Sequence, residues 1–564
     1  MWGKPISHSY PSRPLLHQAS TTPDFHLTGT LPYPGFVSTH FRDTSNVPTD
    51  VYVMHFGGEQ GYSRAMRLGV DFGTTRTTVA LVDRGNYPLV SFDDSDGDSH
   101  EYVPSLVALD GLSVVYGFEA QKLAESGAPF LRSIKRLLAA QDANLDSVVQ
   151  IGSREFKIVD LVTGFLIHVG SRVRAFAEDK DGPLEAVVGV PAHAYSAQRF
   201  ITLEAFRRAR FDVVAMLNEP SAAGYEYTHR HSSMISSRRT KVLVYDLGGG
   251  TFDASLVSAE GTNHEVLASE GNNLLGGDDF DEVLAVCALE ALGVARDSMS
   301  DPQWSRLLED ARSAKEALHP QTRSIVLRVH DQEVSLPVDA FYTQAKPLVE
   351  QTLLAMQGLV DRDANGQLCL PDDVSGLYVV GGGSELPLIL RQLRERFGRR
   401  VRRSPYSAGS TAIGLAIAAD EEAGYSLVDK LSRGLGVFRE WSSGAVVSFD
   451  PLLTPDMRVS PGEGVAITRS YRAVHNVGWY RFAEYTSVDE DGAPRGDVMP
   501  LGEIAFPFDP NLRSGSINLA MVPVERTGPG CLVEEEYRVD PHGIVSVTIR
   551  DAETGFAITR SLGD

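Results

Sequence analysis

The sequence predicts an α/β fold with two similar lobes, followed by a separate all-β domain. Strand-like apolar runs alternate with helical patterns from Arg67 to about Asp420, which is typical of α/β architecture. Two segments in this region share one plan, and they begin about 175 residues apart. Beyond about Tyr425 the helical patterns stop and short alternating runs appear. We therefore expect a duplicated α/β domain and a second, smaller β domain.

The N-terminal residues 1–66 precede the first strand pattern. They are rich in Pro, Ser, Thr, His and Gly and show neither helical nor strand periodicity, which predicts disorder. Met66 directly precedes the first strong strand. The segment is therefore interpreted as a disordered tail or as the product of a start codon assigned too early.

The duplicated unit is a strand, a polar turn and a second strand. It occurs as "RLGVDFGTTRTTVALVD" and as "KVLVYDLGGGTFDASLVS", where each apolar run ends in aspartate before a Gly/Thr turn. Segments such as "SAQRFITLEAFRRARF" and "SRLLEDARSAKEALHP" carry apolar residues at spacings of three and four, which predicts helices. Two similar lobes of strands and helices follow from this order.

The C-terminal region reads as strands and hairpins. Alternating runs such as "GVAITRSYRAV" and "GIVSVTIRDAETGFAITRSL" are separated by turn signals at 540–543 and 551–555. We predict a two-lobed α/β domain over residues 67–420, a linker over 421–430 and a separate β domain over 431–564.

Composition excludes several classes of function. The chain has 564 residues, of which 42% are hydrophobic and 22% charged, and no run approaches the roughly 18 apolar residues of a membrane helix. Its 74 acidic and 52 basic residues give a net charge of −22, which argues against nucleic acid or a membrane as a partner. Three distant cysteines suggest neither a disulfide framework nor a zinc site. With no secretion signal, a cytoplasmic location is expected.

The two turns have the chemistry of an anion site. Glycines let backbone N–H groups approach an anion where a Cβ atom would block it, and the threonine hydroxyls add donors. The residues concerned are Gly73, Thr74 and Thr75 in the first turn and Gly248, Gly249, Gly250 and Thr251 in the second. Asp71 and Asp246 precede the turns and suit a hydrated Mg²⁺ that bridges phosphate oxygens. One such hairpin is more often structural, but the duplication favours a clamp on a triphosphate.

A third element, "LYVVGGGSELPLILRQL", has a strand that delivers three glycines to the start of a helix. Gly381, Gly382 and Gly383 permit close approach to a nucleoside or phosphate at that point. Three such elements in this order indicate a nucleotide site.

With these motifs, residues 67–420 resemble the seventy-kilodalton heat-shock chaperone (heat shock protein 70) family, whose ATPase domain has the actin-like, ribonuclease H-like fold. The resemblance rests on "GVDFGTT", "SIKRLL", "VVGVPAHAYSAQR", "NEPSAAGYEY", "VYDLGGGTFD", "LLGGDDFD" and "VVGGGSELP". It implies ATP and Mg²⁺ as ligands and slow ATP hydrolysis. This set is more specific than any single motif.

The resemblance also implies roles for individual residues. Lys135 matches the lysine that holds the attacking water and the γ-phosphate, and the other catalytic positions are Glu219, Asp246, Thr251 and Asp253. Lys315 matches a lysine that lies along the adenine. Pro191 and Arg199 match a pair that relays the nucleotide state between domains. Outside these motifs, Lys135 reads as a solvated helix lysine and Asp253 as a solvent-facing strand carboxylate.

Three positions depart from the family's pattern. Arg312 stands where an acidic residue is usual, His319 where serine is usual, and Glu385 where arginine is usual. All three border the expected adenosine pocket, so adenine stacking and ribose hydrogen bonding are expected to be rebuilt.

The C-terminal domain resembles the family's substrate-binding β-sandwich, most clearly at its two ends, 431–460 and 533–562, and an unrelated β-sandwich stays open. Such a domain binds an extended apolar peptide by strand-like hydrogen bonds. The chain ends at Asp564 without residues for the family's helical lid, so fast peptide exchange is expected. The linker "GYSLVDKL" has a lysine and fewer leucines than is usual.

The leading interpretation is an ATP-dependent chaperone that binds unfolded polypeptide, with a J-domain co-chaperone and a nucleotide-exchange factor as partners. A nucleotide-switched assembly or scaffold protein with little hydrolysis is the alternative. An actin-like filament or sugar kinase is disfavoured by "LLGGDDFD", "NEPSAAG" and the added β domain.

Overall fold

The computed structural model describes residues 65–179, 182–231, 238–330, 332–431, 433–441, 446–455, 457–459, 464–515 and 517–563. Residues 1–64 of the expected disordered segment therefore lie outside the described residues. Met66 already belongs to the first strand, β1 (Met66–Phe72).

The first large sheet holds the first predicted hairpin. Its five strands run in the order β12-β11-β1-β2-β5, where the other members are β2 (Arg76–Leu81), β5 (Val103–Pro104), β11 (Leu184–Val190) and β12 (Phe211–Asn218). β1 pairs antiparallel with β2 and parallel with β11. Helices α3 (Ile158–Phe176) and α4 (Ser196–Arg208) contribute apolar residues to the same hydrophobic core.

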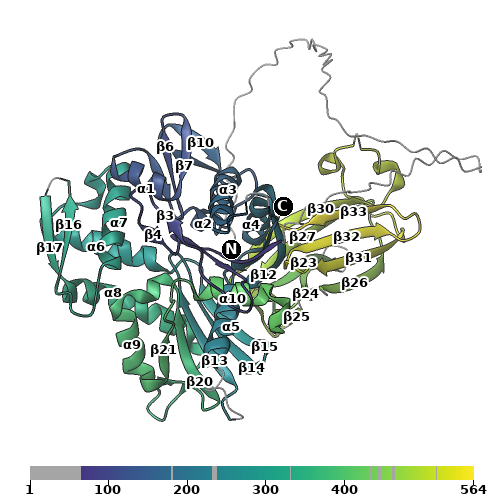
Figure 1. Cartoon of the computed structure of the whole chain (residues 1–564). Coiled ribbons are helices and arrows are strands. Elements are labelled where there is room, and N and C mark those ends of the chain that lie inside the picture. The colour runs from purple at the N-terminus through teal and green to yellow at the C-terminus, as the bar shows by residue number, and fades with distance from the viewer. Residues whose placement is uncertain are drawn as a thin grey trace, which may run out of the picture. The chain divides into compact units, whose positions relative to one another are not determined.

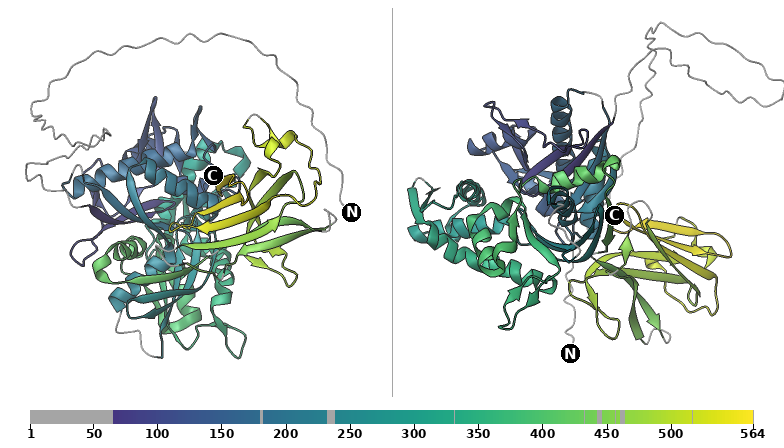
Figure 2. Two further views of the ribbon diagram at one scale, coloured as in Figure 1. Left: turned by 90° about the vertical axis from the view of Figure 1, so that its right-hand side faces the viewer. Right: turned by 60° about the horizontal axis from the view of Figure 1, so that its bottom comes forward.

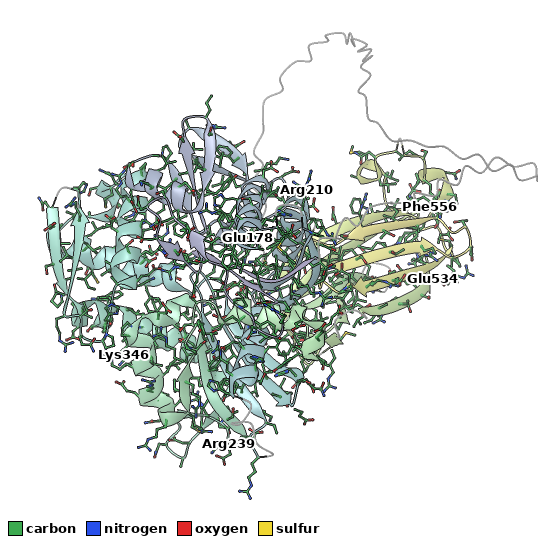
Figure 3. The ribbon with its side chains drawn as sticks, in the orientation of Figure 1. Glu178, Arg210, Arg239, Lys346, Glu534 and Phe556 are labelled. Atoms are coloured by element: carbon green, nitrogen blue, oxygen red, sulfur yellow. The ribbon has the colours of Figure 1, made fainter. Side chains whose placement is uncertain are left out.

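Helices α3 and α4 are both followed by a residue in the left-handed conformation. Glu178 and Arg210, labelled in Figure 3, follow α3 and α4 with φ values of 56° and 64°. A left-handed residue at this position turns the chain out of the helix.

The second large sheet repeats the plan of the first. Its seven strands run in the order β21-β20-β13-β14-β15-β22-β25. The bounds are β13 (Lys241–Leu247), β14 (Phe252–Glu260), β15 (Asn263–Asn272), β20 (Val374–Val380), β21 (Val401–Arg403), β22 (Ser426–Lys430) and β25 (Arg458–Val459). β13 pairs antiparallel with β14 and parallel with β20, as β1 does with β2 and β11. Both predicted strand–turn–strand units are thus antiparallel hairpins beside a parallel strand.

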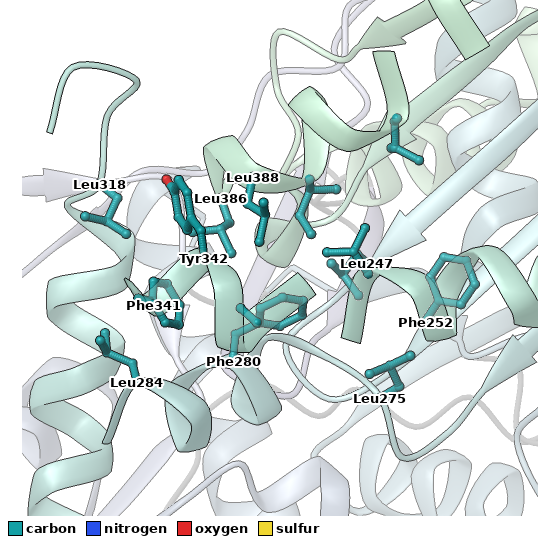
Figure 4. Packing of buried hydrophobic residues seen from close by; sticks show 14 of the residues in the cluster. Leu247, Phe252, Leu275, Phe280, Leu284, Leu318, Phe341, Tyr342, Leu386 and Leu388 are labelled. Carbon is teal, nitrogen blue, oxygen red and sulfur yellow. The ribbon is translucent and has the colours of Figure 1, made fainter. Parts of the chain in front are cut away.

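A large apolar cluster supports the turn of this second hairpin. Figure 4 shows Leu247 and Phe252, which flank the turn, packed near Leu275 and Phe280. The cluster includes residues of four helices, α6 (Gly277–Leu292), α7 (Asp301–Glu316), α8 (Val338–Ala355) and α9 (Pro387–Phe397). The turn is therefore mounted on a rigid base.

Two central helices lie against both large sheets. Helices α5 (Glu219–His231) and α10 (Ser410–Ala419) share a cluster with residues of the first sheet, such as Val187, and of the second, such as Val266. A Cβ atom on Gly414 would lie 1.8 Å from the carbonyl oxygen of Ala222, so only glycine allows this contact between the helices.

The segment expected as a linker is partly a strand. Glu421–Ala423 form a short 3-10 helix, and β22 pairs in parallel with β15, joining His264 to Leu427. This pairing spans about 160 residues of sequence, so local pattern did not reveal it.

The C-terminal described residues form two antiparallel sheets of four strands. One runs β24-β23-β27-β30, built from β23 (Gly434–Trp441), β24 (Val446–Leu453), β27 (Val477–Tyr485) and β30 (Met499–Pro507). The other runs β26-β31-β32-β33, built from β26 (Val465–Arg472), β31 (Leu532–Val539), β32 (Val545–Asp551) and β33 (Ala557–Ser561). The two sheets share one apolar core. Figures 1 and 2 show these strands at the yellow end of the colour scale, without α-helices among them.

The remaining elements are smaller. The helices are α1 (Gly117–Glu125) and α2 (Ile134–Leu137), and the strands include β6 (Leu106–Asp110), β7 (Ser113–Tyr116), β8 (Phe130–Arg132), β9 (Val148–Ile151), β10 (Arg154–Lys157), β16 (Ser324–Val329) and β17 (Gln332–Pro337). Among the described residues no helix is long and apolar enough to cross a membrane. The predicted α/β class is confirmed.

Candidate functional site

The first turn, residues 73–75, is held tightly by its own side of the molecule. Ser105 donates from Oγ to the carbonyl oxygen of Gly73 at 2.8 Å and from its backbone N–H to that of Thr75 at 2.9 Å. A Cβ atom on Gly73 would lie 2.1 Å from the carbonyl oxygen of Arg76. The turn requires glycine at this position.

The second turn, residues 248–251, faces the first. Gly248 donates its N–H to the carbonyl oxygen of Thr251 at 3.0 Å and closes the turn. A Cβ atom on Gly249 would lie 2.6 Å from the Thr75 hydroxyl oxygen, and one on Gly250 would lie 2.7 Å from that of Thr74. The structure therefore brings the two glycine turns into direct contact range.

The third glycine segment lies against the second turn. Gly381 has a φ of 84°, and a Cβ atom there would lie 2.4 Å from Oδ1 of Asp246. One on Gly383 would lie 2.6 Å from the carbonyl oxygen of Gly248, whereas Gly382 has open space around it. All three predicted glycine segments thus lie together around the second turn, which contacts both of the others.

A buried ion pair lies at the centre of this place. Lys135 Nζ is 2.6 Å from Glu219 Oε1, and the two residues are 4% and 8% exposed. Lys135 sits in the short helix α2, whose entry residue Ser133 has a φ of 57°, and Glu219 begins α5 just after β12. Lys135 is therefore not a solvated helix lysine.

Three aspartates surround the pair. Burial, together with the charge of Glu219, raises the pKa of Asp71 to about 7, and the same two causes raise the pKa of Asp253 to about 7. They also raise the pKa of Asp246 well above its usual value. Burial opposes the charge of Lys135, but the charges of Glu219 and Asp71 outweigh it and raise the lysine pKa. Asp253 is 1% exposed, so it is not a solvent-facing carboxylate.

This donor set fits a hydrated divalent cation. Four carboxylates share one ammonium group, and burial, together with the charge of Glu219, raises the pKa of the three aspartates. Among the described residues no group of three or more His, Cys, Asp or Glu side chains is placed to hold a metal directly. Mg²⁺ keeps several of its waters and needs only one or two carboxylates, which suits Asp71 and Asp246.

A fourth segment, "LLGGDDFD", supplies backbone contacts that no single-residue prediction included. Gly277 donates its N–H to the carbonyl oxygen of Gly248 at 2.9 Å, and Asp278 donates to that of Gly249 at 2.7 Å. Lys315 Nζ is 2.6 Å from the carbonyl oxygen of Gly277 and 2.5 Å from Asp281 Oδ1. The predicted nucleoside residue Lys315 therefore lies beside the second turn, held by an ion pair.

Arg132 was not predicted either. Its Nη2 lies 2.7 Å from Asp281 Oδ2 and 3.0 Å from Asp278 Oδ1. Its partners lie about 150 residues away in the sequence, so no local pattern predicts these contacts. The sequence indicated this segment only through the motif "SIKRLL", which contains Lys135.

The departures from the family's pattern have defined partners. Arg312 donates from Nη2 to the carbonyl oxygen of Thr75 at 3.0 Å. Glu385 pairs with Arg403 at 3.2 Å, and His319 donates its N–H to the Thr322 hydroxyl just after α7.

The predicted relay residues lie on the path to the C-terminal strands. Ala192, which follows Pro191, donates its N–H to Asp253 Oδ1 at 3.1 Å. Arg199 donates to Asn218 Oδ1, and Asn218 Nδ2 donates to Asp429 Oδ2 at 2.9 Å. Burial lowers the pKa of Arg199 and raises that of Asp429 to about 6.

Direct contacts also join α4 and its neighbours to the C-terminal sheets. The Tyr195 hydroxyl donates to Asp497 Oδ2 at 2.8 Å. Ser196 Oγ donates to Glu484 Oε2 at 3.2 Å, and His542 Nε2 lies 2.9 Å from the carbonyl oxygen of Val213. Arg199 is thus joined through Asn218 to Asp429 of β22, and separate hydrogen bonds from residues beside it reach the C-terminal strands.

Comparison with known proteins gives a consistent assignment. The profile of the family described as "Hsp70 protein" matches residues 67–432. The chain is 33% identical over 388 residues to the chaperone protein HscA homolog of Pseudomonas fluorescens, covering 65% of this chain and 59% of the relative. It is 29% identical over 520 residues to chaperone protein HscA of Edwardsiella ictaluri, covering 88% and 77%. The chain thus spans about three fifths of the length of the first of these relatives.

Proposed function

Because this chain belongs to the Hsp70 protein family, we propose that it is an ATP-dependent molecular chaperone that couples ATP hydrolysis to binding and release of extended polypeptide. The observation that carries the proposal is the buried pair of Lys135 and Glu219 beneath two facing glycine turns. The family match and the similarity to chaperones named HscA support it.

In this proposal residues 67–420 form a two-lobed, actin-like ATPase domain, one lobe on each large sheet. Residues 421–430 form the linker, and residues 431–564 form a substrate-binding β-sandwich. The repeated hairpin plan of the two sheets supports the two lobes, and the shared apolar core of the C-terminal sheets supports the sandwich.

The chain's own residues account for the proposed hydrolysis. Backbone N–H groups of the two turns and the hydroxyls of Thr74, Thr75 and Thr251 bind phosphate oxygens. Lys135 holds negative charge that develops on the transferring phosphoryl group, and Glu219 keeps Lys135 charged and in place. Asp253 and Glu219 orient the attacking water.

Asp71 and Asp246 would hold Mg²⁺ through its waters, and the bound ion would neutralise charge on the phosphate oxygens. Gly381, Gly382, Gly383 and Lys315 would line the nucleoside side of the site. Pro191 and Arg199 would transmit the nucleotide state, because Ala192, next to Pro191, donates to Asp253, and Arg199 donates to Asn218, which in turn donates to Asp429.

The proposed partners follow from the family. Unfolded or extended polypeptide is the substrate, a J-domain co-chaperone and a nucleotide-exchange factor are the regulators, and the cytoplasm is the location. The net charge of −22 disfavours nucleic acid and anionic membrane surfaces.

Single-turnover hydrolysis of ATP by wild type and Lys135→Ala, with and without an unfolded polypeptide, tests the proposal. We expect slow hydrolysis that the polypeptide stimulates, and a loss of at least about a hundredfold in Lys135→Ala, as for other preorganised charges in active sites. Lys122→Ala is the matched control, because Lys122 is exposed and its ammonium group contacts Ser95 and Asp96 of a surface segment. Hydrolysis unchanged in Lys135→Ala would contradict the catalytic assignment.

A nucleotide-switched assembly protein with little hydrolysis is the second candidate. Arg312, one of the departures from the family's pattern, favours it, because this residue donates to the Thr75 carbonyl oxygen and so changes the contacts of the first turn. Tight nucleotide binding without hydrolysis, with or without polypeptide, is the outcome that selects it.

A further inference from the structure

A basic surface lies at one edge of the second large sheet. The segment "RQLRERFGRRVRR", residues 391–403, contains seven arginines and one glutamate, in a chain whose net charge is −22. It forms α9, a short 3-10 turn (Gly398–Arg400) and β21, which is the edge strand of this sheet. None of these arginines belongs to the proposed nucleotide site, so that function does not account for their concentration here.

Basic residues from an earlier part of the chain lie at the same end of the sheet. β13, β20 and β21 are parallel neighbours, so the segments that lead into them enter the sheet side by side. Arg238 and Arg239, both exposed, come just before β13, and Figure 3 labels Arg239. Neighbouring strands lie about 5 Å apart, which places the backbone of this pair roughly 10 to 15 Å from that of Arg399 and Arg400.

The end of helix α5 lies beside the same strand. Arg230 lies over the ring of Tyr406, just after β21, with its guanidinium carbon 4.6 Å from the ring centre. Burial, together with the charges of Arg402 and Arg230, lowers the pKa of His231. Three separate parts of the chain thus contribute to one surface. We call this surface the basic edge and define it by Arg230, Arg238, Arg239, Arg399, Arg400 and Arg402.

Few carboxylates neutralise the basic edge. Within the described part of the chain, Arg230 is the one member that forms an ion pair, and its partner is Glu226. Asp373, at the start of β20, is already paired with Lys241 at 2.6 Å, and Asp372 is exposed beside it. Most of the arginines are therefore left to bind an external anion.

One side of β21 has no strand beside it. Among the described residues β21 pairs with β20 alone, so an extended peptide can add to its outer side as a further strand. Arg402 lies on this strand, and its buried Nε atom has no hydrogen-bond partner in the described part of the chain. Arginines at such an edge repel a basic segment and attract an acidic one, because guanidinium groups bind carboxylates through two parallel hydrogen bonds.

The charge of the rest of the chain favours a short occupant. The chain has 74 acidic and 52 basic residues, so a long polyanion or a membrane that extends past the basic edge meets mostly negative charge. Nucleic acids and lipid headgroups also lack the alternating donors and acceptors with which a peptide backbone pairs with a strand. A short acidic stretch of polypeptide meets both conditions.

We propose that the basic edge binds an extended, acidic segment of a partner polypeptide, which adds as a strand beside β21. Carboxylates of the segment pair with the arginines, and its backbone bonds to the outer side of β21. The inference goes beyond the proposed function, because it needs no nucleotide and involves none of the residues assigned to the nucleotide site.

Fluorescence anisotropy with the full chain and a labelled oligoglutamate peptide of about ten residues, roughly 33 Å long when extended, tests this inference. We expect wild type to bind the peptide and to bind it more weakly as salt is added. The double variant Arg238→Glu, Arg399→Glu should bind at least about tenfold more weakly, because two exposed charge contacts become repulsive. Binding within twofold of wild type would overturn the inference.

The matched control is the double variant Arg328→Glu, Arg481→Glu. It changes the net charge equally, and both side chains are exposed, at 67% and 69%, on β16 and β27. We expect the control to bind oligoglutamate as wild type does. Equal losses in the control and in the first variant would show that net charge, and not the basic edge, governs binding.

The folding of the variants is checked by their melting temperatures. Arg238 and Arg399 are exposed and form no ion pair in the described part of the chain, so their replacement should leave the fold intact. Arg394→Glu, Arg396→Glu, at the exposed end of α9, is the second variant, and it should also weaken binding.

Two further probes test the kind of occupant. Oligoglutamate with N-methyl groups on alternate backbone amides keeps its charge but loses hydrogen-bond donors, so it should bind at least about fivefold more weakly. Equal affinity would contradict strand addition. Tighter binding of single-stranded RNA or of phosphatidylserine vesicles than of oligoglutamate, lost in Arg238→Glu, Arg399→Glu, would overturn the assignment to an acidic polypeptide.

Discussion

At the scale of single residues, the site is a balance of charge. Lys135 lies among four carboxylates and pairs with Glu219 at 2.6 Å, whereas within the described part of the chain Asp71, Asp246 and Asp253 form no ion pair. Burial and the charge of Glu219 raise the pKa values of these three aspartates. A bound Mg²⁺ would stabilise their charged forms and so lower these pKa values.

The pKa of Asp253, raised to about 7, predicts a pH dependence of stability. Between about pH 4 and pH 7 the folded chain keeps a proton on Asp253 that the unfolded chain has released, so the free energy of unfolding falls as pH rises through this window. The side-chain amide of the Asp253→Asn variant does not titrate in this window. We expect the free energy of unfolding of Asp253→Asn relative to wild type to increase from pH 4 to 7 and to level above it.

Urea unfolding at several pH values, without metal or nucleotide, measures this difference. Asp212→Asn is the control, since Asp212 is an exposed residue on β12. A difference between Asp253→Asn and wild type that does not vary with pH would show that Asp253 is already ionised throughout.

Single residues also show where sequence prediction ends. Lys135 and Asp253 were found through the motifs that contain them, and the structure gives both a buried position. The contact of Arg132 with Asp281 and that of Arg312 with Thr75 were not predicted. They join residues 149 and 237 positions apart, and such pairs leave no periodic signal in the sequence. Charge pairing over such distances depends on the tertiary fold.

At the scale of elements, the strand β22 is the most consequential feature. Its Leu427 is 3% exposed and lies in the apolar cluster that includes residues of α5 and α10, while its Asp429 accepts a hydrogen bond from Asn218. The strand thus joins the second sheet to the polar network of Arg199. A movement of α5 or β15 would therefore displace β22, because both contact it.

Leu427→Asp should detach this strand. A carboxylate in an apolar cluster costs several kcal/mol, more than the short pairings of β22 with β15 and β25 supply. We expect the amide hydrogens of β22 to exchange with solvent at least about tenfold faster in Leu427→Asp, and stimulation of the ATPase by polypeptide to be lost.

Ser426→Asp provides the comparison, because Ser426 is the exposed neighbour on the same strand. If Leu427→Asp exchanges its amides and responds to polypeptide as wild type does, β22 does not carry the signal.

Elements differed in how well the sequence predicted them. The hairpins β1–β2 and β13–β14 were predicted because an apolar run, a glycine turn and a second run are local signals. The strand β22 was not predicted, because it is formed by pairing with β15 and by burial of Leu427. Its sequence alone reads as a connecting segment.

At the scale of the whole molecule, we propose that the duplicated sheets and the hydrogen bonds of Tyr195 and Arg199 act together in one cycle. Nucleotide between the turns would set the separation of the two sides, and α4 with Arg199 and Tyr195 would pass this to β22 and the C-terminal strands.

Release of a fluorescent, extended apolar peptide tests the coupling of ATP to polypeptide most directly. The full chain is loaded with peptide in ADP, excess unlabelled peptide is added with either ADP or ATP and Mg²⁺, and the release rate is measured, with Leu427→Asp as the uncoupled control. The account predicts release at least about tenfold faster with ATP in wild type, a differential of about 1.4 kcal/mol, and no such difference in the control. Peptide that leaves wild type at the same rate in ATP and ADP would contradict it.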